Sequence, residues 1–67
     1  MREIVYYMRE IIYYTIQRYV GSWVDDRDFD TRDEAEAEIT WMRKYQPEYK
    51  YRIVEKRRVV TYEREED

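Results

Sequence analysis

One segment in the middle of the chain contains both a helix start and a helix stop, and it constrains the fold more than any other feature. The run Thr31-Arg32-Asp33-Glu34 has the spacing of a capping box, in which the threonine caps the amide of the glutamate and the glutamate reaches back. Pro47 cannot continue a helix. The apolar stripe between these signals consists of Ala35, Ile39 and Met42, widened by Trp41 and Tyr45. The segment therefore predicts one amphipathic helix, from about Arg32 to Tyr45, that needs a surface to cover.

The segments on either side of this helix have the residue pattern of strands. After the proline, Tyr49–Tyr62 alternates apolar and basic residues with a period of two, which predicts one strand of unusual length. Before the helix, Ile11–Val20 is rich in β-branched and aromatic residues, and Gly21-Ser22 forms a turn. Trp23-Val24 then begins a short returning strand, so we expect a hairpin.

The first 14 residues contain an internal repeat, because Met1–Tyr7 and Met8–Tyr14 differ only at the fifth place. Ile4, Met8 and Ile11 have heptad-like spacing, so a helix is one interpretation of the repeat. Isoleucine, valine and tyrosine form strands better than helices, and the long last strand needs a partner. We therefore favour a first strand that extends back to about Glu3, and the helix remains the alternative.

These elements predict a single α+β domain over residues 1–67 with the order β-β-α-β. A crossover from the second strand to the third over the first gives the sheet order 2-1-3, with the helix on one face and long first and third strands. Residues 1–7 are then a duplicated strand extension, and residues 63–67 are an acidic tail. The predicted core is Ile12, Tyr14, Ile16, Trp23, Ala35, Ile39, Met42, Tyr51 and Ile53, and Trp41 is also assigned to a buried face.

The predicted strands are longer than the helix, so their far ends should project as an uncovered two-stranded ribbon. An isolated ribbon of this kind is marginal in water and is a template for pairing. We therefore expect a homodimer or a higher oligomer, in which the basic residues of the third strand meet the acidic tail of the second copy. The residues expected at this protein interface are Tyr6, Tyr7, Val59, Val60 and Tyr62.

The composition argues against catalysis, because the chain has no histidine and no cysteine and has only one glycine. These absences remove the commonest general base, the commonest metal ligands and the glycine loops that hold phosphates. We therefore expect no enzyme activity, no cofactor and no metal. The sequence lacks an apolar run of membrane-spanning length and a leader with a cleavage site, which predicts no membrane association and a cytoplasmic protein. A charge-rich, amide-poor composition is commoner in proteins of hot environments. On this ground we give a thermophilic source and a mesophilic source equal weight.

Acidic and basic residues are separated along the chain. Residues 25–38 hold eight carboxylates and two arginines, whereas residues 43–58 hold seven bases and two glutamates. The acidic stretch is interpreted as a solvated turn and helix face, as a surface that imitates nucleic acid, or as a cation site at Asp26, Asp28 and Asp30. The candidate acidic surface is Asp25, Asp26, Asp28, Glu34 and Glu38. The candidate basic surface is Lys50, Arg52, Lys56, Arg57 and Arg58, which is either a solvated strand face or a site for single-stranded nucleic acid.

Three segments together resemble a group of small β-β-α-β proteins encoded by bacteriophages and related bacterial elements. The segments run from Tyr14 to Asp25 (YTIQRYVGSWVD), from Phe29 to Ala35 (FDTRDEA) and from Tyr51 to Val54 (YRIV). The resemblance covers about Ile12 to Asp67; the duplicated first heptad and the basic Lys56-Arg57-Arg58 depart from it. It implies the fold and a phage-like origin, and it brings no catalytic residues.

The functional expectation is a non-enzymatic interaction protein of phage type that binds a host protein and modulates or inhibits it, acting as a homo-oligomer in the host cytoplasm. A surplus of tyrosine supports this expectation, because nine tyrosines are more than one small core can bury. Binding of single-stranded nucleic acid through the basic, tyrosine-rich third strand is the alternative. A purely structural assembly unit is a further alternative.

Overall fold

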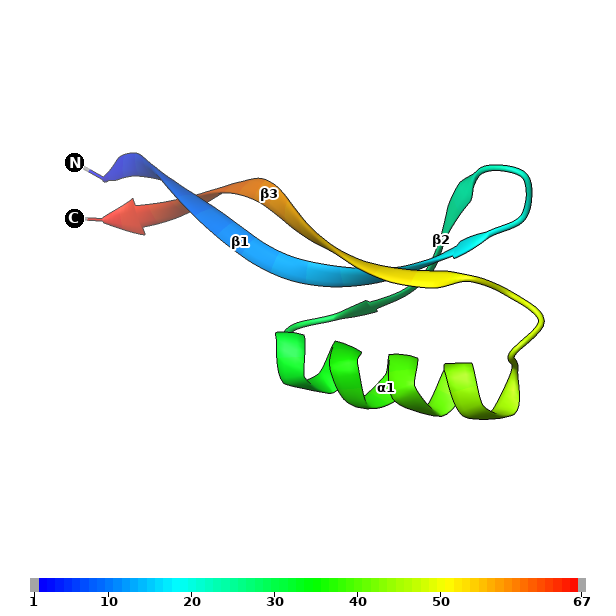
Figure 1. The fold of residues 1–67 in the computed structure, drawn as a ribbon. Coiled ribbons are helices and arrows are strands. Elements are labelled where there is room, and N and C mark those ends of the chain that lie inside the picture. The colour runs from blue at the N-terminus through cyan, green and yellow to red at the C-terminus, as the bar shows by residue number, and fades with distance from the viewer. Residues whose placement is uncertain (1, 67) are drawn as a thin grey trace.

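The computed structural model describes residues 2–66 and contains three strands and one helix (Figure 1). The elements are β1 (Glu3–Tyr19), β2 (Trp23–Phe29), α1 (Arg32–Tyr45) and β3 (Tyr51–Glu66). The sheet order is β2-β1-β3, and both neighbouring pairs are antiparallel. The predicted α+β fold, its order of elements and its sheet order are confirmed. Met1 and Asp67, at the ends of the expected domain, lie outside the described residues.

Residues 3–14 of the N-terminal repeat are part of strand β1. This strand pairs with β3 without interruption from Glu3 opposite Glu66 to Arg18 opposite Tyr51. The preference of the repeat for strand structure is satisfied because β3 supplies a partner of matching length. The helical interpretation of the repeat is therefore wrong.

Strand β2 begins at Trp23 as predicted and continues to Phe29, because it pairs with β1 as far as Tyr14. The predicted bounds of the last strand differ from the structure at both ends. Strand β3 begins at Tyr51 instead of Tyr49. It also continues through four residues of the expected acidic tail, 63–66, because the first residues of β1 pair with them.

A tight turn joins β1 to β2 and fixes their register. Tyr19 lies opposite Trp23, and the amide of Val20 donates a 2.9 Å hydrogen bond to the carbonyl of Ser22. Gly21 has a φ of 94°, a value that side-chain-bearing residues rarely adopt. This requirement explains why the single glycine of the chain stands here.

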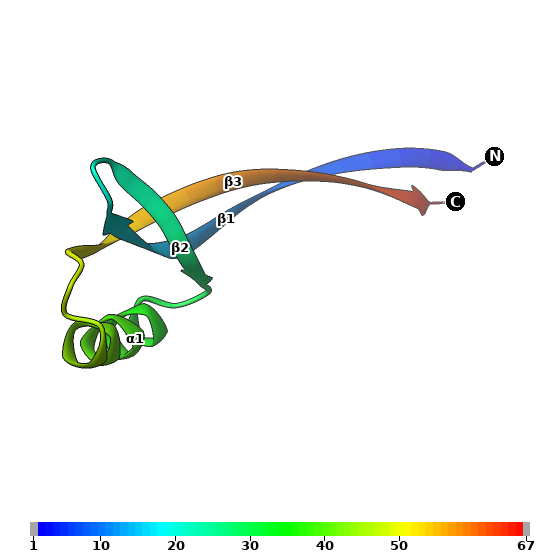
Figure 2. The same cartoon turned by 90° about the vertical axis from the view of Figure 1, so that its right-hand side faces the viewer.

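Helix α1 has the predicted bounds and the predicted N-terminal cap. The hydroxyl of Thr31 accepts a 3.3 Å hydrogen bond from the amide of Glu34 and donates one of 2.9 Å to its carboxylate. At the other end, the amide of Gln46 donates to the carbonyl of Met42 at 2.7 Å. The helix lies against one face of the sheet, as Figure 2 shows from the side.

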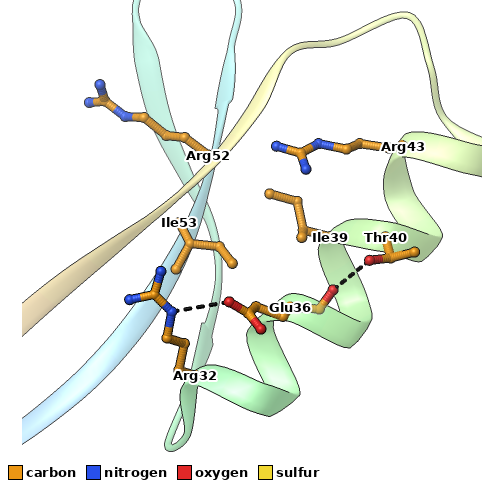
Figure 3. Close-up of a pocket in the computed structure, with 7 residues that line it drawn as sticks. All are labelled: Arg32, Glu36, Ile39, Thr40, Arg43, Arg52 and Ile53. Atoms are coloured by element: carbon orange, nitrogen blue, oxygen red, sulfur yellow. Dashed lines mark hydrogen bonds and ion pairs between the residues drawn. The ribbon is translucent and has the colours of Figure 1, made fainter.

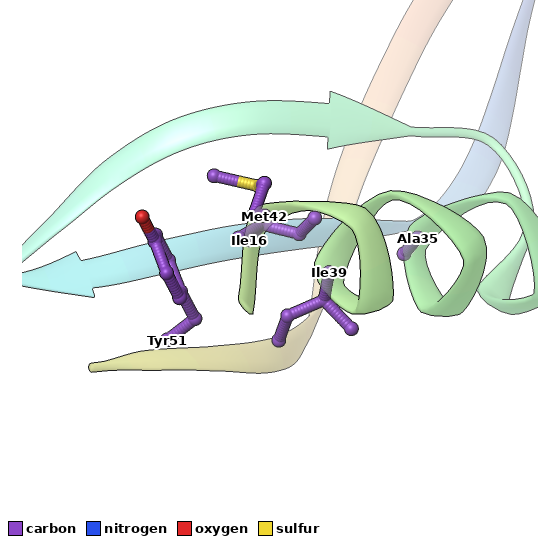
Figure 4. Close-up of a cluster of buried hydrophobic side chains, with 5 residues drawn as sticks. All are labelled: Ile16, Ala35, Ile39, Met42 and Tyr51. Atoms are coloured by element: carbon purple, nitrogen blue, oxygen red, sulfur yellow. The ribbon is translucent and has the colours of Figure 1, made fainter. Parts of the chain in front are cut away.

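The core lies between α1 and the sheet and is small. Its buried residues are Ile16, Ala35, Ile39, Met42 and Tyr51, drawn in Figure 4, and Tyr14, Phe29 and Ile53 pack partly buried against them. Seven of the nine predicted core residues are among these eight. The phenol of Tyr51 donates to the carbonyl of Gln46 at 2.8 Å, so its polar atom is satisfied within the core.

Three predicted core positions are wrong. Ile12 is 43% exposed, although it lies on the helix side of the sheet, because it is beyond the end of α1. Trp23 lies opposite Tyr19 on the other face of the sheet and is half-buried. Trp41 is 47% exposed and contacts Tyr45 on the outside of the helix, with ring centroids 5.1 Å apart.

The two long strands project far beyond the helix. The chain measures 61 × 24 × 13 Å along its principal axes, and the far end consists only of β1 and β3 (Figures 1 and 2). The expected uncovered ribbon is therefore present. We call this part, residues 3–13 with residues 56–66, the ribbon.

Candidate protein-interaction surface

The face of the sheet opposite α1 has no helix over it, and we call it the open face (Figure 2). Because side chains alternate along a strand, the open face takes the odd-numbered residues of β1 and the even-numbered residues of β3. Ile16 and Ile53, which pack on the helix, have the opposite parity. In β2 the open face takes the partners of odd-numbered β1 residues, such as Trp23 and Asp25.

A polar network crosses the open face from β3 over β1 to β2. The guanidinium of Arg52 donates to the side-chain carbonyl of Gln17 at 2.8 Å, and the Gln17 amide donates to Asp25 at 2.8 Å. Lys56 donates to the other oxygen of Asp25 at 2.5 Å. These bonds lower the pKa of Asp25, through Lys56 first and Gln17 second, and the bond to Asp25 raises the pKa of Lys56. The network therefore holds both charges in fixed positions.

Thr15 lies beside this network on the central strand and is fully buried. Its hydroxyl donates a 2.6 Å hydrogen bond to Asp28, the residue opposite it in β2. Sequence reasoning missed Thr15 because a threonine between Tyr14 and Ile16 has no distinctive pattern. Its burial on the open face shows that the surrounding side chains form a closed layer there.

Tyrosine, tryptophan and arginine form three groups along the open face. In the first group, the guanidinium of Arg52 lies 4.2 Å above the ring of Trp23, which is 5.3 Å from the ring of Tyr19. In the second, Arg58 lies 5.7 Å from the ring of Tyr13. We call these groups, with the third described next, the aromatic ladder.

The third group lies farther out along the ribbon than the second, and in it the rings of Tyr7 and Tyr62 stack with centroids 5.4 Å apart. The phenol of Tyr7 donates a 2.6 Å hydrogen bond to Glu66, and this bond is the main cause of its raised pKa. The predicted interface residues thus divide between two faces. Tyr7, Val60 and Tyr62 have open-face parity, whereas Tyr6 and Val59 have helix-side parity.

Each residue of the candidate acidic surface contacts another side chain of the same chain. Besides Asp25 and Asp28, which join the open-face contacts, Asp26 lies 4.0 Å from Arg18 and 3.6 Å from Arg27. Glu38 pairs with Arg27, and Glu34 bonds to the helix cap. These contacts give each of the five carboxylates a role in stabilising the fold.

Asp26 is the extra residue of a β-bulge, because Ile16 lies opposite Arg27 while Gln17 lies opposite Asp25. The bulge interrupts the alternation that suggested a cation site at Asp26, Asp28 and Asp30. Within residues 2–66, no three acidic, histidine or cysteine side chains gather in a way that could hold a metal ion.

The candidate basic surface is partly neutralised by contacts within the chain. Lys56 bonds to Asp25, and Arg57 lies 3.4 Å from Glu10 and 4.0 Å from Glu55. Arg52 and Arg58 belong to the aromatic ladder. Lys50 precedes β3 and is exposed. The acidic and basic segments, separate in the sequence, therefore meet across the sheet.

An open groove of about 440 Å³ lies between α1 and β3 (Figure 3). Ile39 and Ile53 face each other in it, and Arg32 and Arg43 lie on the helix side of the groove, whereas the side chain of Arg52 points away from the two isoleucines. Arg32 is paired with Glu36 at 3.1 Å, and Arg43 donates to the carbonyl of Tyr51 at 3.2 Å. These groups already have partners, so the groove is weaker than the open face as a candidate site.

Comparisons with known proteins provide no assignment for this surface. No protein-family model, no curated protein and no solved structure matches the chain. In the part of the chain that the structure describes, no helix has the length and apolar character needed to cross a membrane.

Proposed function

We propose that this chain is a non-enzymatic, phage-type interaction protein that binds a host protein through its open face and thereby modulates or inhibits it. The observation that carries the proposal is the aromatic ladder, which lies on the face that the helix leaves uncovered. The phage-like origin is supported by the sequence resemblance, and we place its action in the host cytoplasm. The absence of histidine and cysteine from the chain favours binding over catalysis.

The ladder has the composition of an energetically important interface. Tryptophan, tyrosine and arginine are the residues whose truncation most often weakens protein complexes by about 2 kcal/mol or more. Arg52 is held between the Gln17 carbonyl at 2.8 Å and the Trp23 ring at 4.2 Å. Because its position is fixed before binding, its side chain loses less conformational entropy in a complex. We therefore place the centre of the binding surface at Trp23 and Arg52.

The two tryptophans provide a matched test of this placement. We expect the tagged wild-type chain to retain a protein from a bacterial lysate. The Trp41→Ala variant should retain the same protein, because Trp41 lies on the outer side of the helix. Trp23→Ala should lose that protein, and Trp23→Phe should recover part of the binding. Circular dichroism checks that each variant keeps its fold. Equal retention by Trp23→Ala and wild type would show that the open face is not the binding surface.

Binding of single-stranded nucleic acid is the second candidate, because the open face has both aromatic rings and bases. The pairing of Lys56 with Asp25 and the formal charge of −3 argue against it. Fluorescence anisotropy with single-stranded oligonucleotides decides between the two candidates. Salt-sensitive binding that is lost when Lys56, Arg57 and Arg58 become alanine would favour nucleic acid over protein.

A further inference from the structure

The edge of β1 that faces away from β3 has no partner within residues 2–66 along the ribbon. Strand β2 pairs with β1 only from Tyr14 to Tyr19, so residues 3–13 leave their backbone donors and acceptors unpaired on this side. We call this part the free β1 edge. Three apolar side chains of this segment are 55%, 67% and 76% exposed, namely Ile4, Tyr6 and Met8. A long, apolar, unpaired edge is a template for another strand.

We propose that the free β1 edge pairs with the same edge of a second copy of this chain, antiparallel and with Tyr6 at the two-fold axis. The inference is independent of the proposed function, because it uses the ribbon edge and leaves the Trp23 and Arg52 surface unchanged. It also specifies a contact between copies, which the alternative function of a structural assembly unit requires.

Geometry limits the registers that such a pair can adopt. Opposing residues in an antiparallel ladder point to the same face, so each must have the parity of its partner. In a two-fold pair, one residue therefore lies opposite its own copy. With Tyr6 at that position, the two chains form one sheet whose helices lie on the same side.

The charges of the ribbon select the register centred on Tyr6. It places Glu3 opposite Arg9 of the second copy, and the symmetry creates this pair twice. Within residues 2–66, neither Glu3 nor Arg9 makes an ion pair. Opposite charges facing each other across neighbouring strands stabilise the pairing. The second copy therefore supplies partners for two charges that form no ion pair within residues 2–66 of one chain.

The same register matches the apolar residues. The opposing pairs are Ile4 with Met8, Val5 with Tyr7, and Tyr6 with Tyr6. The register centred on Tyr7 would instead place Glu3 opposite Ile11 and Ile4 opposite Glu10, and so would bring carboxylates against apolar side chains. Only the register centred on Tyr6 matches both charge and apolar character.

The second copy also fits between the existing elements. In this register, residue 3 of the second copy lies opposite Arg9, and β2 begins to pair with β1 only at Tyr14. Self-pairing of the outer edge of β3 centred on Val60 would bring like charges together, because it places Lys56 opposite Arg64 and Glu55 opposite Glu65. A register of that edge centred on Thr61 would instead place Lys56 opposite Glu66, so the charge-reversal experiment below, which changes β1 alone, separates the two edges.

Charge reversal on the full-length chain tests the proposal. We expect the wild type to sediment as a dimer at micromolar concentration. Glu3→Arg and Arg9→Glu should each weaken the dimer about ten-fold or more, because two attractive pairs become two like-charged pairs. The double variant Glu3→Arg/Arg9→Glu should restore it. An equimolar mixture of the two single variants should form a heterodimer, since each supplies the charge that the other lacks.

Two matched charge reversals outside the ribbon serve as controls. Glu48→Arg and Lys50→Glu change the net charge by the same amounts and should leave the dimer unchanged. A wild type that stays at 8.6 kDa would overturn the proposal. A dimer that survives both single reversals, or single variants that do not recombine, would also overturn it, because the contact would then lie elsewhere.

Discussion

At the scale of single residues, the open face joins two segments that the sequence keeps apart. The acidic Asp25 lies on β2 and the basic Lys56 on β3, and β1 lies between these strands. Gln17 on the central strand completes the connection by donating to Asp25 and accepting from Arg52. The acidic and basic residues that are separate along the chain therefore pair across the central strand, and these pairs connect the two outer strands.

The Asp25–Lys56 pair predicts a specific pH dependence of stability. The pKa of Asp25 is below its ordinary value of 3.8 in the folded chain, so its contribution is present above pH 3.8 and is lost as the pH falls through the folded-state pKa. Lys56 has its pKa raised above 10.5, so its contribution is present below pH 10.5 and is lost as the pH rises through the folded-state pKa.

Urea unfolding at a series of pH values measures this dependence. Lys56→Met should lose less stability on acidification than the wild type, because Asp25 then keeps only its bond from Gln17. Lys50→Met is the control and should follow the wild-type profile. If Lys56→Met and wild type lose equal stability in acid, the pair does not contribute to the fold.

At the scale of elements, the sequence predicts the bounds of the helix more accurately than it predicts which side chains are buried. The cap at Thr31 and the stop before Pro47 are local signals, and the helix has the predicted length. The faces of β1 were also assigned correctly at Ile16. The predicted burial of Ile12 is wrong, because burial depends on how far a helix from another part of the chain extends along the strand. The β-bulge at Asp26 and the face of Trp23 likewise depend on pairing that no short pattern specifies.

The reach of α1 can be measured with two isoleucines on the same side of β1. Ile16→Ala should destabilise the chain by about 2–5 kcal/mol, because Ile16 is fully buried beneath the helix. Ile12→Ala should cost about 1 kcal/mol or less, because its side chain is 43% exposed. Chemical denaturation compares the two free energies of unfolding, and equal losses would mean that the packing extends beyond the helix.

At the scale of the whole molecule, the two ends of the sheet differ in what stabilises them. At one end, α1 covers three strands and encloses the core. At the other, two strands continue without a covering layer, and such a ribbon is marginally stable alone. The sequence predicts this difference, because its strand patterns are longer than its helix pattern. The register proposed for a second copy could be derived only from the structure, which shows where β1 pairs with β2 and β3.

Hydrogen exchange can separate the two ends within one sample. In the dimer, amides of residues 4–9 should be protected, because the ribbon becomes the centre of a four-stranded sheet. In Arg9→Glu at the same concentration, these amides should exchange rapidly, while those of residues 15–18 remain protected by β2, β3 and the helix. Protection of residues 4–9 that is equal in both proteins would show that the ribbon is stable without a second copy. Rapid exchange of these residues in both would show that the second copy does not cover them.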